Sequence, residues 1–182
     1  IGQQALGWLR EHQLPDGSWG AASPKYFHDR LVCTLAAVIS LAKYNDPRDI
    51  GRIQRAKIAL ETELKELAYE ASIETIGFEV IMPTLFHEAE QLGIIQSHSY
   101  PNTQIISRQR AAKLAALPGG VISRHATLAF SAEMAGTDQL SLLDIENLQE
   151  ANGSLGNSPS ATAYFALDVS PKNAAALNYL RN

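Results

Sequence analysis

The stretch QLPDGSWGAASP, residues 13–24, returns in altered form as QEANGSLGNSP at residues 149–159. Both copies follow the pattern Q-x-x-[DN]-G-S-[WL]-G, and each ends in Ser-Pro. The Asx-Gly pair favours a turn, because Gly accepts positive φ and Asp or Asn bonds to nearby backbone. Ser-Pro is typical of the N-cap and first residue of a helix. Ordinary turn chemistry would explain these features, but it does not explain the repeated Gln, whose amide could bond open carbonyls at a helix C-terminus.

Apolar residues in the rest of the chain recur mostly at helical spacing. Within residues 27–44, Leu31, Leu35, Val38 and Leu41 fall at steps of three and four, as in a helix that packs against a core. Strand-like alternation is scarce, so we predict an all-α chain of short antiparallel helices. Further helices are expected at residues 2–12, 48–68, 76–93, 104–117, 122–136, 139–150, 160–168 and 171–181.

Composition excludes several classes of protein. The chain has 182 residues, a net charge of −4 and no dense basic run, which argues against a nucleic-acid surface. Cys33 is the single cysteine, so no internal disulfide can form, and no apolar run reaches the length of a membrane span. We expect one domain in the cytoplasm. The opening IGQQALGWLREHQ reads as the middle of a helix, so a fragment of a longer protein is expected.

Three segments together carry a family resemblance. They are the first QLPDGSWG copy, ETIGFEVIMPTLFHEAEQLGI at residues 74–94, and LLDIENLQEANGSLGNSPSATAYFAL at residues 142–167. The first resembles the QW motif of triterpene and class II diterpene cyclases, and the other two are similar to the γ domain of the latter. The likeness is strongest to the bacterial members that form tuberculosinyl (halimadienyl) diphosphate. It implies an α/α barrel (toroid) of the terpenoid cyclase/protein prenyltransferase type, with residues 1–182 as one γ domain.

The resemblance also implies a reaction. Class II diterpene cyclases protonate geranylgeranyl diphosphate at its terminal alkene, cyclise it and retain the diphosphate. Their acid is an Asp of a D-x-D-D motif in the β domain, and this chain contains no such motif. Asp46 and Asp49 are the two aspartates nearest to each other in the sequence. We interpret them as a solvated cap for the following helix. We therefore expect the chain alone to be inactive, with the β domain of the same enzyme as its partner.

Glu79 matches the acidic position that holds Mg²⁺ near the diphosphate in this family. Pro83 lies four residues on and lacks an N–H, so the Glu79 carbonyl loses its usual helical donor and a kink is expected. An acidic helix start suits a cation that prefers oxygen ligands. The alternative is that Pro83 is the first residue of a helix that begins near Met82. Glu70 and Glu74 could add charge nearby or lie on the surface.

Three further residues are candidates for substrate contact or proton transfer. Lys113 matches the diphosphate-binding lysine of the family, although it could also belong to a solvated charge cluster. Phe130 occupies the position where plant ent-copalyl diphosphate synthases carry a His that assists the terminal base. A phenyl ring cannot accept a proton, so it can only shape the cavity and stabilise a cation, which favours a rearranged product. His125 is a candidate substitute base or, equally, a structural histidine at a helix start.

Two alternatives stay open at this point. The chain could be a stand-alone helical toroid that binds a prenyl chain or a partner protein without catalysis, since it contains no acid motif. A protein prenyltransferase β subunit shares the barrel, but it requires Zn²⁺ held by Asp, Cys and His. Cys33 reads as part of an apolar stripe and has no suitable companion ligand in the sequence, which argues against that subunit.

Overall fold

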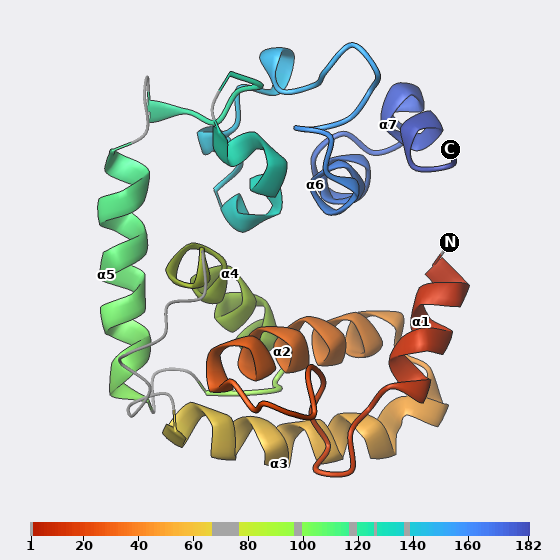
Figure 1. The fold of residues 1–182 in the computed structure, drawn as a ribbon, viewed down its shortest axis with the longest axis vertical. Coiled ribbons are helices and arrows are strands. Elements are labelled where there is room, and N and C mark those ends of the chain that lie inside the picture. Colours follow the sequence, from red (N-terminus) through yellow and green to blue (C-terminus); the bar gives the residue numbers. More distant parts are fainter. Residues whose placement is uncertain (1, 67–76, 97–99, 117–119, 126, 137–138) are drawn as a thin grey trace. The chain divides into compact units, whose positions relative to one another are not determined.

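The computed structural model describes residues 2–66, 77–96, 100–116, 120–125, 127–136 and 139–182. Within these ranges the regular structure is helical (Figure 1), and extended pairing is limited to isolated bridges at Ile122–Leu143 and Leu155–Ser158. The predicted all-α class is therefore confirmed. None of the helices in these ranges is long and apolar enough to cross a membrane.

Helices of three types make up this part of the chain. The α-helices are α1 (Gly2–Glu11), α2 (Phe27–Tyr44), α3 (Ile50–Glu66), α4 (Phe78–Gln91), α5 (Pro101–Ala115), α6 (Pro159–Tyr164) and α7 (Ala174–Tyr179). Short 3₁₀ helices lie at Pro47–Asp49, Leu140–Leu142 and Ile145–Asn147, and a 3₁₀ helix at Thr127–Ala135 is kinked at Ser131. A π-helical segment at Phe165–Val169 follows α6 directly.

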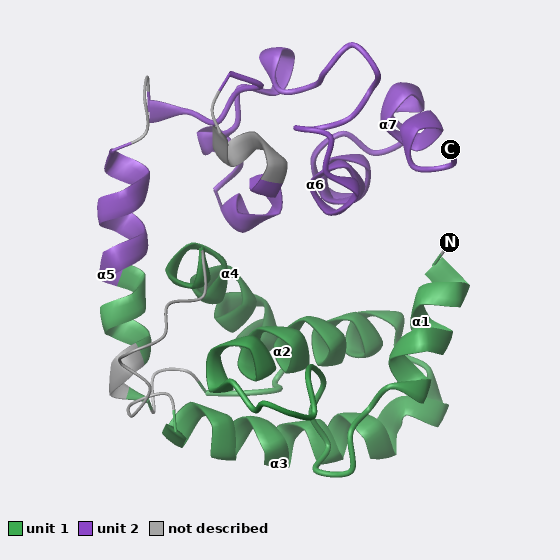
Figure 2. Cartoon of the chain, viewed as in Figure 1, with its two compact units in different colours: residues 1–107 green, residues 108–182 purple. Residues whose placement is uncertain are grey.

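The chain divides into two compact units, residues 1–107 and 108–182 (Figure 2). In the first unit, α2 packs against both α3 and α4. The predicted apolar stripe of α2 is fully buried at Leu31, Leu35 and Val38. Burial of such a stripe stabilises a helix more than its intrinsic propensity does.

The two Ser-Pro pairs behave differently. Ser158 caps α6, because its Oγ accepts a hydrogen bond from the Ala161 N–H at 3.3 Å and Pro159 is the first helical residue. The same prediction is wrong for Ser23-Pro24, since α2 begins three residues later with extended Tyr26 as N-cap. Two residues before this Ser-Pro pair, the Ala21 carbonyl accepts a hydrogen bond from Arg30 Nη1 at 2.9 Å.

The second unit has its own core. Two of the α-helices predicted for this unit are not formed as predicted. Residues 120–125 form turns and a bridge, so the expected helix 122–136 is reduced to the 3₁₀ helix Thr127–Ala135. Residues 139–150 contain two single 3₁₀ turns, because Ile122 N–H bonds to the Leu142 carbonyl (2.6 Å) and Asp144 N–H bonds to the Ile122 carbonyl (3.0 Å). These long-range backbone bonds replace the helical ones.

The other predicted helices are observed. Their ends differ by three residues or fewer wherever the structure describes them, if the π-helical continuation of α6 is included. The core of the second unit is formed by buried side chains from the 3₁₀ helices, the second Gln-containing turn and α6–α7. Its largest fully or almost fully buried members are Ile122, Leu148, Leu155 and Phe165.

Candidate functional site

The first Gln-containing turn, residues 13–20, joins α1 to α3 and to the core; we name it the first glutamine turn. The Gln13 amide donates hydrogen bonds to the carbonyls of Gly17 and Arg52, each at 2.9 Å. Trp19 is almost fully buried, and its indole N–H donates to the Leu9 carbonyl at 2.8 Å. The turn therefore fixes the end of α1 against the first turns of α3.

Residues 149–156, the second glutamine turn, repeat this arrangement in the second unit. The Gln149 amide donates to the Gly153 carbonyl at 2.7 Å and to Asn173 Oδ1 at 3.1 Å. Leu155 is fully buried in the place that Trp19 takes in the first copy. The predicted Gln–carbonyl bonds exist, but their carbonyl acceptors lie in the turn itself and at Arg52 of α3, not at the end of the preceding helix. The second acceptor of Gln149 is the side chain of Asn173, the N-cap of α7.

One glycine in each turn is required by close packing. Gly17 has φ +91°, and a Cβ there would lie 2.5 Å from the Arg55 carbonyl oxygen. Gly153 has φ +88°, and its Cβ would lie 2.4 Å from the Ala175 carbonyl oxygen. Both positions favour Gly through backbone conformation and through close contact with a helix, which is α3 for Gly17 and α7 for Gly153.

A buried charge cluster behind the first glutamine turn was not predicted from the sequence. Arg30 is 3% exposed and donates to Asp16 Oδ2 (2.5 Å), to the Ala21 carbonyl (2.9 Å) and to Ser18 Oγ. Glu63 of α3 is 2% exposed, and its Oε1 lies 3.8 Å from Arg30 Nε. Burial raises the pKa of the Glu63 carboxyl to about 7, although the charge of Arg30 opposes this.

A second ion-pair group corrects the prediction for the NDPRD turn. Asp49 is fully buried and accepts from Arg10 Nη2 at 2.7 Å, so it is not a solvated cap. Asp46 does cap the following 3₁₀ turn, because its Oδ1 accepts the Arg48 N–H at 2.9 Å. Hydrogen bonds from Arg48 hold the pKa of Asp46 well below its ordinary value.

Glu79 lies in the first turn of α4, and Pro83 lies inside the same helix. The alternative, a helix that begins near Met82 with Glu79 in its lead-in, is therefore wrong. Phe78, the residue before Glu79, is 7% exposed and stacks on the His28 imidazole, with ring centroids 4.3 Å apart. Glu70 and Glu74 lie outside the described residues.

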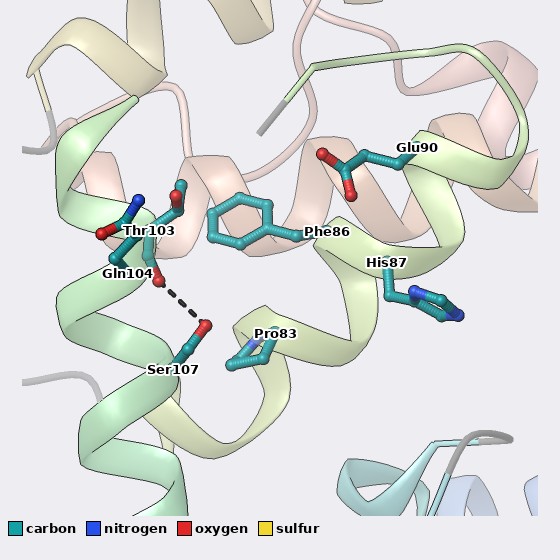
Figure 3. Close-up of a pocket in the computed structure, with 7 residues that line it drawn as sticks. All are labelled: Pro83, Phe86, His87, Glu90, Thr103, Gln104 and Ser107. Atoms are coloured by element: carbon teal, nitrogen blue, oxygen red, sulfur yellow. Dashed lines mark hydrogen bonds between the residues drawn. The ribbon is translucent and has the colours of Figure 1, made fainter. Parts of the chain in front are cut away.

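A pocket of about 250 Å³ opens between α4 and α5 (Figure 3). The Phe86 ring reaches toward α5, and Pro83 lies beside Ser107, whose hydroxyl donates to the Thr103 carbonyl at 3.0 Å. The lining residues are Pro83, Phe86, His87, Glu90, Thr103, Gln104 and Ser107. Its wall combines apolar and polar groups, and it begins one helical turn beyond Glu79.

The other predicted residues belong to the second unit. Lys113 is exposed near the end of α5, one turn beyond Arg110, which is buried and donates to the Met134 and Ala135 carbonyls. His125 is exposed in a turn before the 3₁₀ helix Thr127–Ala135, and its ring lies 3.5 Å from Arg124 Nε. Phe130 is part of that 3₁₀ helix, but its side chain lies outside what the structure describes.

Glu79 thus lies in the first unit and the other three candidates in the second, so their convergence on one cleft stays a prediction. Among the described residues, no three His, Cys, Asp or Glu side chains gather as ligands for a metal. Cys33 is exposed on α2, which corrects its placement in the apolar stripe. The ligand set of a protein prenyltransferase is not formed within this part of the chain.

Known proteins resemble this chain over nearly its full length. No protein-family model matches the sequence. The type B diterpene cyclase of Mycobacterium tuberculosis is 45% identical over 97% of this chain and 36% of its own length. A chloroplastic ent-copalyl diphosphate synthase of Zea mays is 34% identical over 91% of this chain and 20% of its own.

Two solved structures share the fold. Abietadiene synthase from Abies grandis matches with a TM-score of 0.82 and 27% identity over 98% of this chain and 23% of its own. Ent-copalyl diphosphate synthase from Arabidopsis thaliana, in complex with (S)-15-aza-14,15-dihydrogeranylgeranyl thiolodiphosphate, matches with a TM-score of 0.83 and 32% identity over 99% and 26%. The predicted cyclase-like fold is confirmed, and the chain spans about a fifth to a third of the length of these relatives.

Proposed function

We propose that this chain, which is homologous to a segment of the class II diterpene cyclases, is the γ domain of such an enzyme. In this role it helps a β domain to cyclise geranylgeranyl diphosphate by alkene protonation, with the diphosphate retained. The observation that carries the proposal is the likeness, over 99% of the chain, to a cyclase solved with a geranylgeranyl thiolodiphosphate analogue. The first glutamine turn fits the QW motif of that family in residue type, and both turns join helices through their Gln side chains.

Glu79 is the proposed contact for Mg²⁺. Its carboxylate supplies the oxygen ligand that Mg²⁺ prefers, and the cation usually takes only one or two protein carboxylates when substrate phosphates complete its shell. The arrangement around Glu79 fits this mode, because the described residues provide no cluster of three ligands that would hold the metal alone. Mg²⁺ would neutralise charge on the diphosphate, while Glu79 fixes where that charge lies.

Lys113 is the proposed diphosphate contact in the second unit. An exposed ammonium at the end of a helix can reach a phosphate oxygen, and buried Arg110 fixes the preceding turn through its two carbonyl bonds. Phe130 is proposed to shape the cavity wall, and exposed His125 is the candidate base, reached through water. The chain has no D-x-D-D motif, so the initiating proton must come from the β domain.

The proposal is tested by incubating the chain with geranylgeranyl diphosphate and Mg²⁺, with and without a β domain that contains D-x-D-D. We expect a cyclised diphosphate only from the mixture. Product from the chain alone would overturn the division of roles. If prenyl diphosphate binds and the mixture yields no product, the non-catalytic toroid is favoured instead.

Two pairs of variants assign the contacts within that mixture. Lys113→Gln should raise the KM for geranylgeranyl diphosphate about tenfold, whereas Arg108→Gln, an exposed basic residue on the same helix, should not. Glu79→Gln should raise the Mg²⁺ concentration needed for half-maximal rate, whereas Glu88→Gln, which removes a surface pair with Lys43, should not. Equal effects within a pair would contradict the assigned contact.

A further inference from the structure

His28 lies in the first turn of α2, directly beside the first turn of α4. Its imidazole covers Phe78 with ring centroids 4.3 Å apart and an interplanar angle of 22°, a stacked geometry. Phe78 is the first residue of α4 and belongs to the buried core of the first unit. Because Glu79 is the next residue, the position of this ring also sets the position of the Glu79 backbone.

The first turn of α4 begins without a side-chain cap. Its N-cap is Gly77 at φ 76°, which has no side chain to accept a capping bond. The N–H groups of Val80 and Ile81 both bond to the Gly77 carbonyl, and Pro83 has no N–H to offer the Glu79 carbonyl. The direction of this turn is therefore set by side-chain packing, to which Phe78 contributes together with buried Val80 and Met82.

The imidazole has a cost that an apolar ring would not have. His28 Nδ1 is buried and has no hydrogen-bond partner among the described residues. A buried polar atom in this state lowers stability, so the flat ring matters here more than its hydrogen-bonding capacity. Aromatic contacts of this kind contribute about 0.5–1.5 kcal/mol beyond their buried area.

We propose that His28 is a positioning residue for the metal contact: by stacking on Phe78 it holds the first turn of α4 so that the Glu79 carboxylate meets the cation. This inference rests on the proposed role of Glu79. His28 touches neither the cation nor the substrate in this account, and it acts through Phe78. Groups that orient metal ligands in this way usually change metal affinity by roughly tenfold or more when they are removed.

The test measures binding of the Mn²⁺–pyrophosphate complex to the whole chain by isothermal titration calorimetry. Glu79→Gln should weaken binding most, and His28→Leu should weaken it roughly tenfold. His28→Phe, which keeps the stack, should bind as the wild-type chain does and unfold at an equal or higher temperature. His12→Leu is the matched control, because it removes an equivalent stack on Trp8 (centroids 4.1 Å apart) away from α4.

The outcomes separate the two proposals. If Glu79→Gln binds Mn²⁺ as well as the wild-type chain, both the metal contact and the positioning role are overturned. If Glu79→Gln weakens binding and folded His28→Leu does not, only the positioning role fails. Equal loss in His28→Leu and His28→Phe would overturn stacking as the cause, and equal loss in His12→Leu would show a general effect on the first unit. The folded state of each variant is checked by circular dichroism.

Discussion

The two glutamine turns have the same backbone hydrogen bonds in two different electrostatic settings. Leu14 N–H bonds to the Ser18 carbonyl in the first and Glu150 N–H bonds to the Ser154 carbonyl in the second, each at 2.8 Å. In the first, Asp16 accepts from buried Arg30, which also lies beside buried Glu63. In the second, Asn152 takes the place of Asp16 and donates to Asn157 Oδ1 at 3.0 Å.

This difference shows which residues of the motif are required by the backbone conformation of the turn and which depend on neighbouring charged side chains. The Gln and the Gly have the same local roles in both turns, because each Gln donates to the carbonyl of the turn glycine and each Gly avoids a backbone carbonyl. The second acceptor of the Gln differs, since it is the Arg52 carbonyl in the first turn and Asn173 Oδ1 in the second. The Asx position needs only an oxygen that accepts the Ser N–H, at 3.1 Å in the first turn and 3.0 Å in the second. Its charge matters only where an arginine is buried against it.

The largest expected effect tests the shared geometry. Gly17→Ala and Gly153→Ala should each lower the free energy of unfolding by about 3 kcal/mol, because the methyl group meets a backbone carbonyl at positive φ. Gly93→Ala, at φ +63° with no atom within 4 Å of the added Cβ, is the control and should cost about 1 kcal/mol. Urea unfolding measures all three, and similar losses would contradict the close-packing explanation.

The next effect tests the charge that only the first turn carries. The folded chain binds the Glu63 proton more tightly than the unfolded chain, because the pKa rises from 4.5 to about 7. The stability contributed by the protonated carboxyl is therefore complete below about pH 4.5 and is lost as the pH rises through about 7.

Glu63→Gln removes this proton linkage and keeps the size of the side chain. Relative to the wild-type chain, it should gain on the order of 2 kcal/mol between pH 5 and pH 8. The difference between the two unfolding free energies at each pH isolates Glu63, because every other side chain is the same in both proteins. A difference that does not change with pH would contradict the raised pKa.

Substitution of the two glutamines should have a smaller effect on the free energy of unfolding. Gln13→Ala and Gln149→Ala each remove two amide hydrogen bonds and should each cost about 1–2 kcal/mol. Gln13 should lie at the upper end, because its Oε1 accepts from the charged Arg55 Nη2, whereas Gln149 Oε1 accepts from the neutral Asn173 Nδ2 at 3.4 Å. The double variant should show the sum of the two losses, since the residues share no partner. A sum that falls well short would indicate that the turns are coupled.

The smallest effect converts the first turn into the charge pattern of the second. Asp16→Asn keeps the acceptor for Ser18 and removes the ion pair with Arg30. The Asp16 side chain is 49% exposed, so the cost should stay below roughly 1 kcal/mol and should shrink further in 1 M salt. A larger, salt-independent loss in thermal unfolding would mean that Asp16 compensates the buried arginine more than its exposure indicates.

Local pattern predicted the first unit well. The apolar stripe of α2 and the bounds of α3 and α4 follow from helical spacing, because long amphipathic segments leave no competing structure. Sequence alone could not pair Arg30 with Glu63, which are far apart along the chain and meet only when α2 packs on α3. Asp49 was misread for the same reason, since its partner Arg10 belongs to another helix.

The second unit was predicted less well for a physical reason. TLAFSAEMA, residues 127–135, is apolar on most sides and offers no distinct stripe, so its helical type could not be inferred. In residues 139–150, Asp144 and Asn147 bond to each other locally, and the bridge from Ile122 takes backbone groups that a helix would need. For the site, the positions of Glu79 and Lys113 within their helices were accessible, whereas His125 lies in a turn and not in the expected helix 122–136. The mutual geometry of these residues depends on both units.

The Arg10–Asp49 pair has a practical consequence for anyone who trims this chain. Asp49 is fully buried at the start of α3, and Arg10 of α1 approaches it through Nε and Nη2. Deleting α1 would leave the buried Asp49 carboxylate without Arg10. The ion pair between Asp49 Oδ1 and Arg52 Nη1, 3.5 Å apart, would remain. A shortened version should therefore keep α1, or replace Asp49 with Asn at the same time, to avoid an aggregation-prone product.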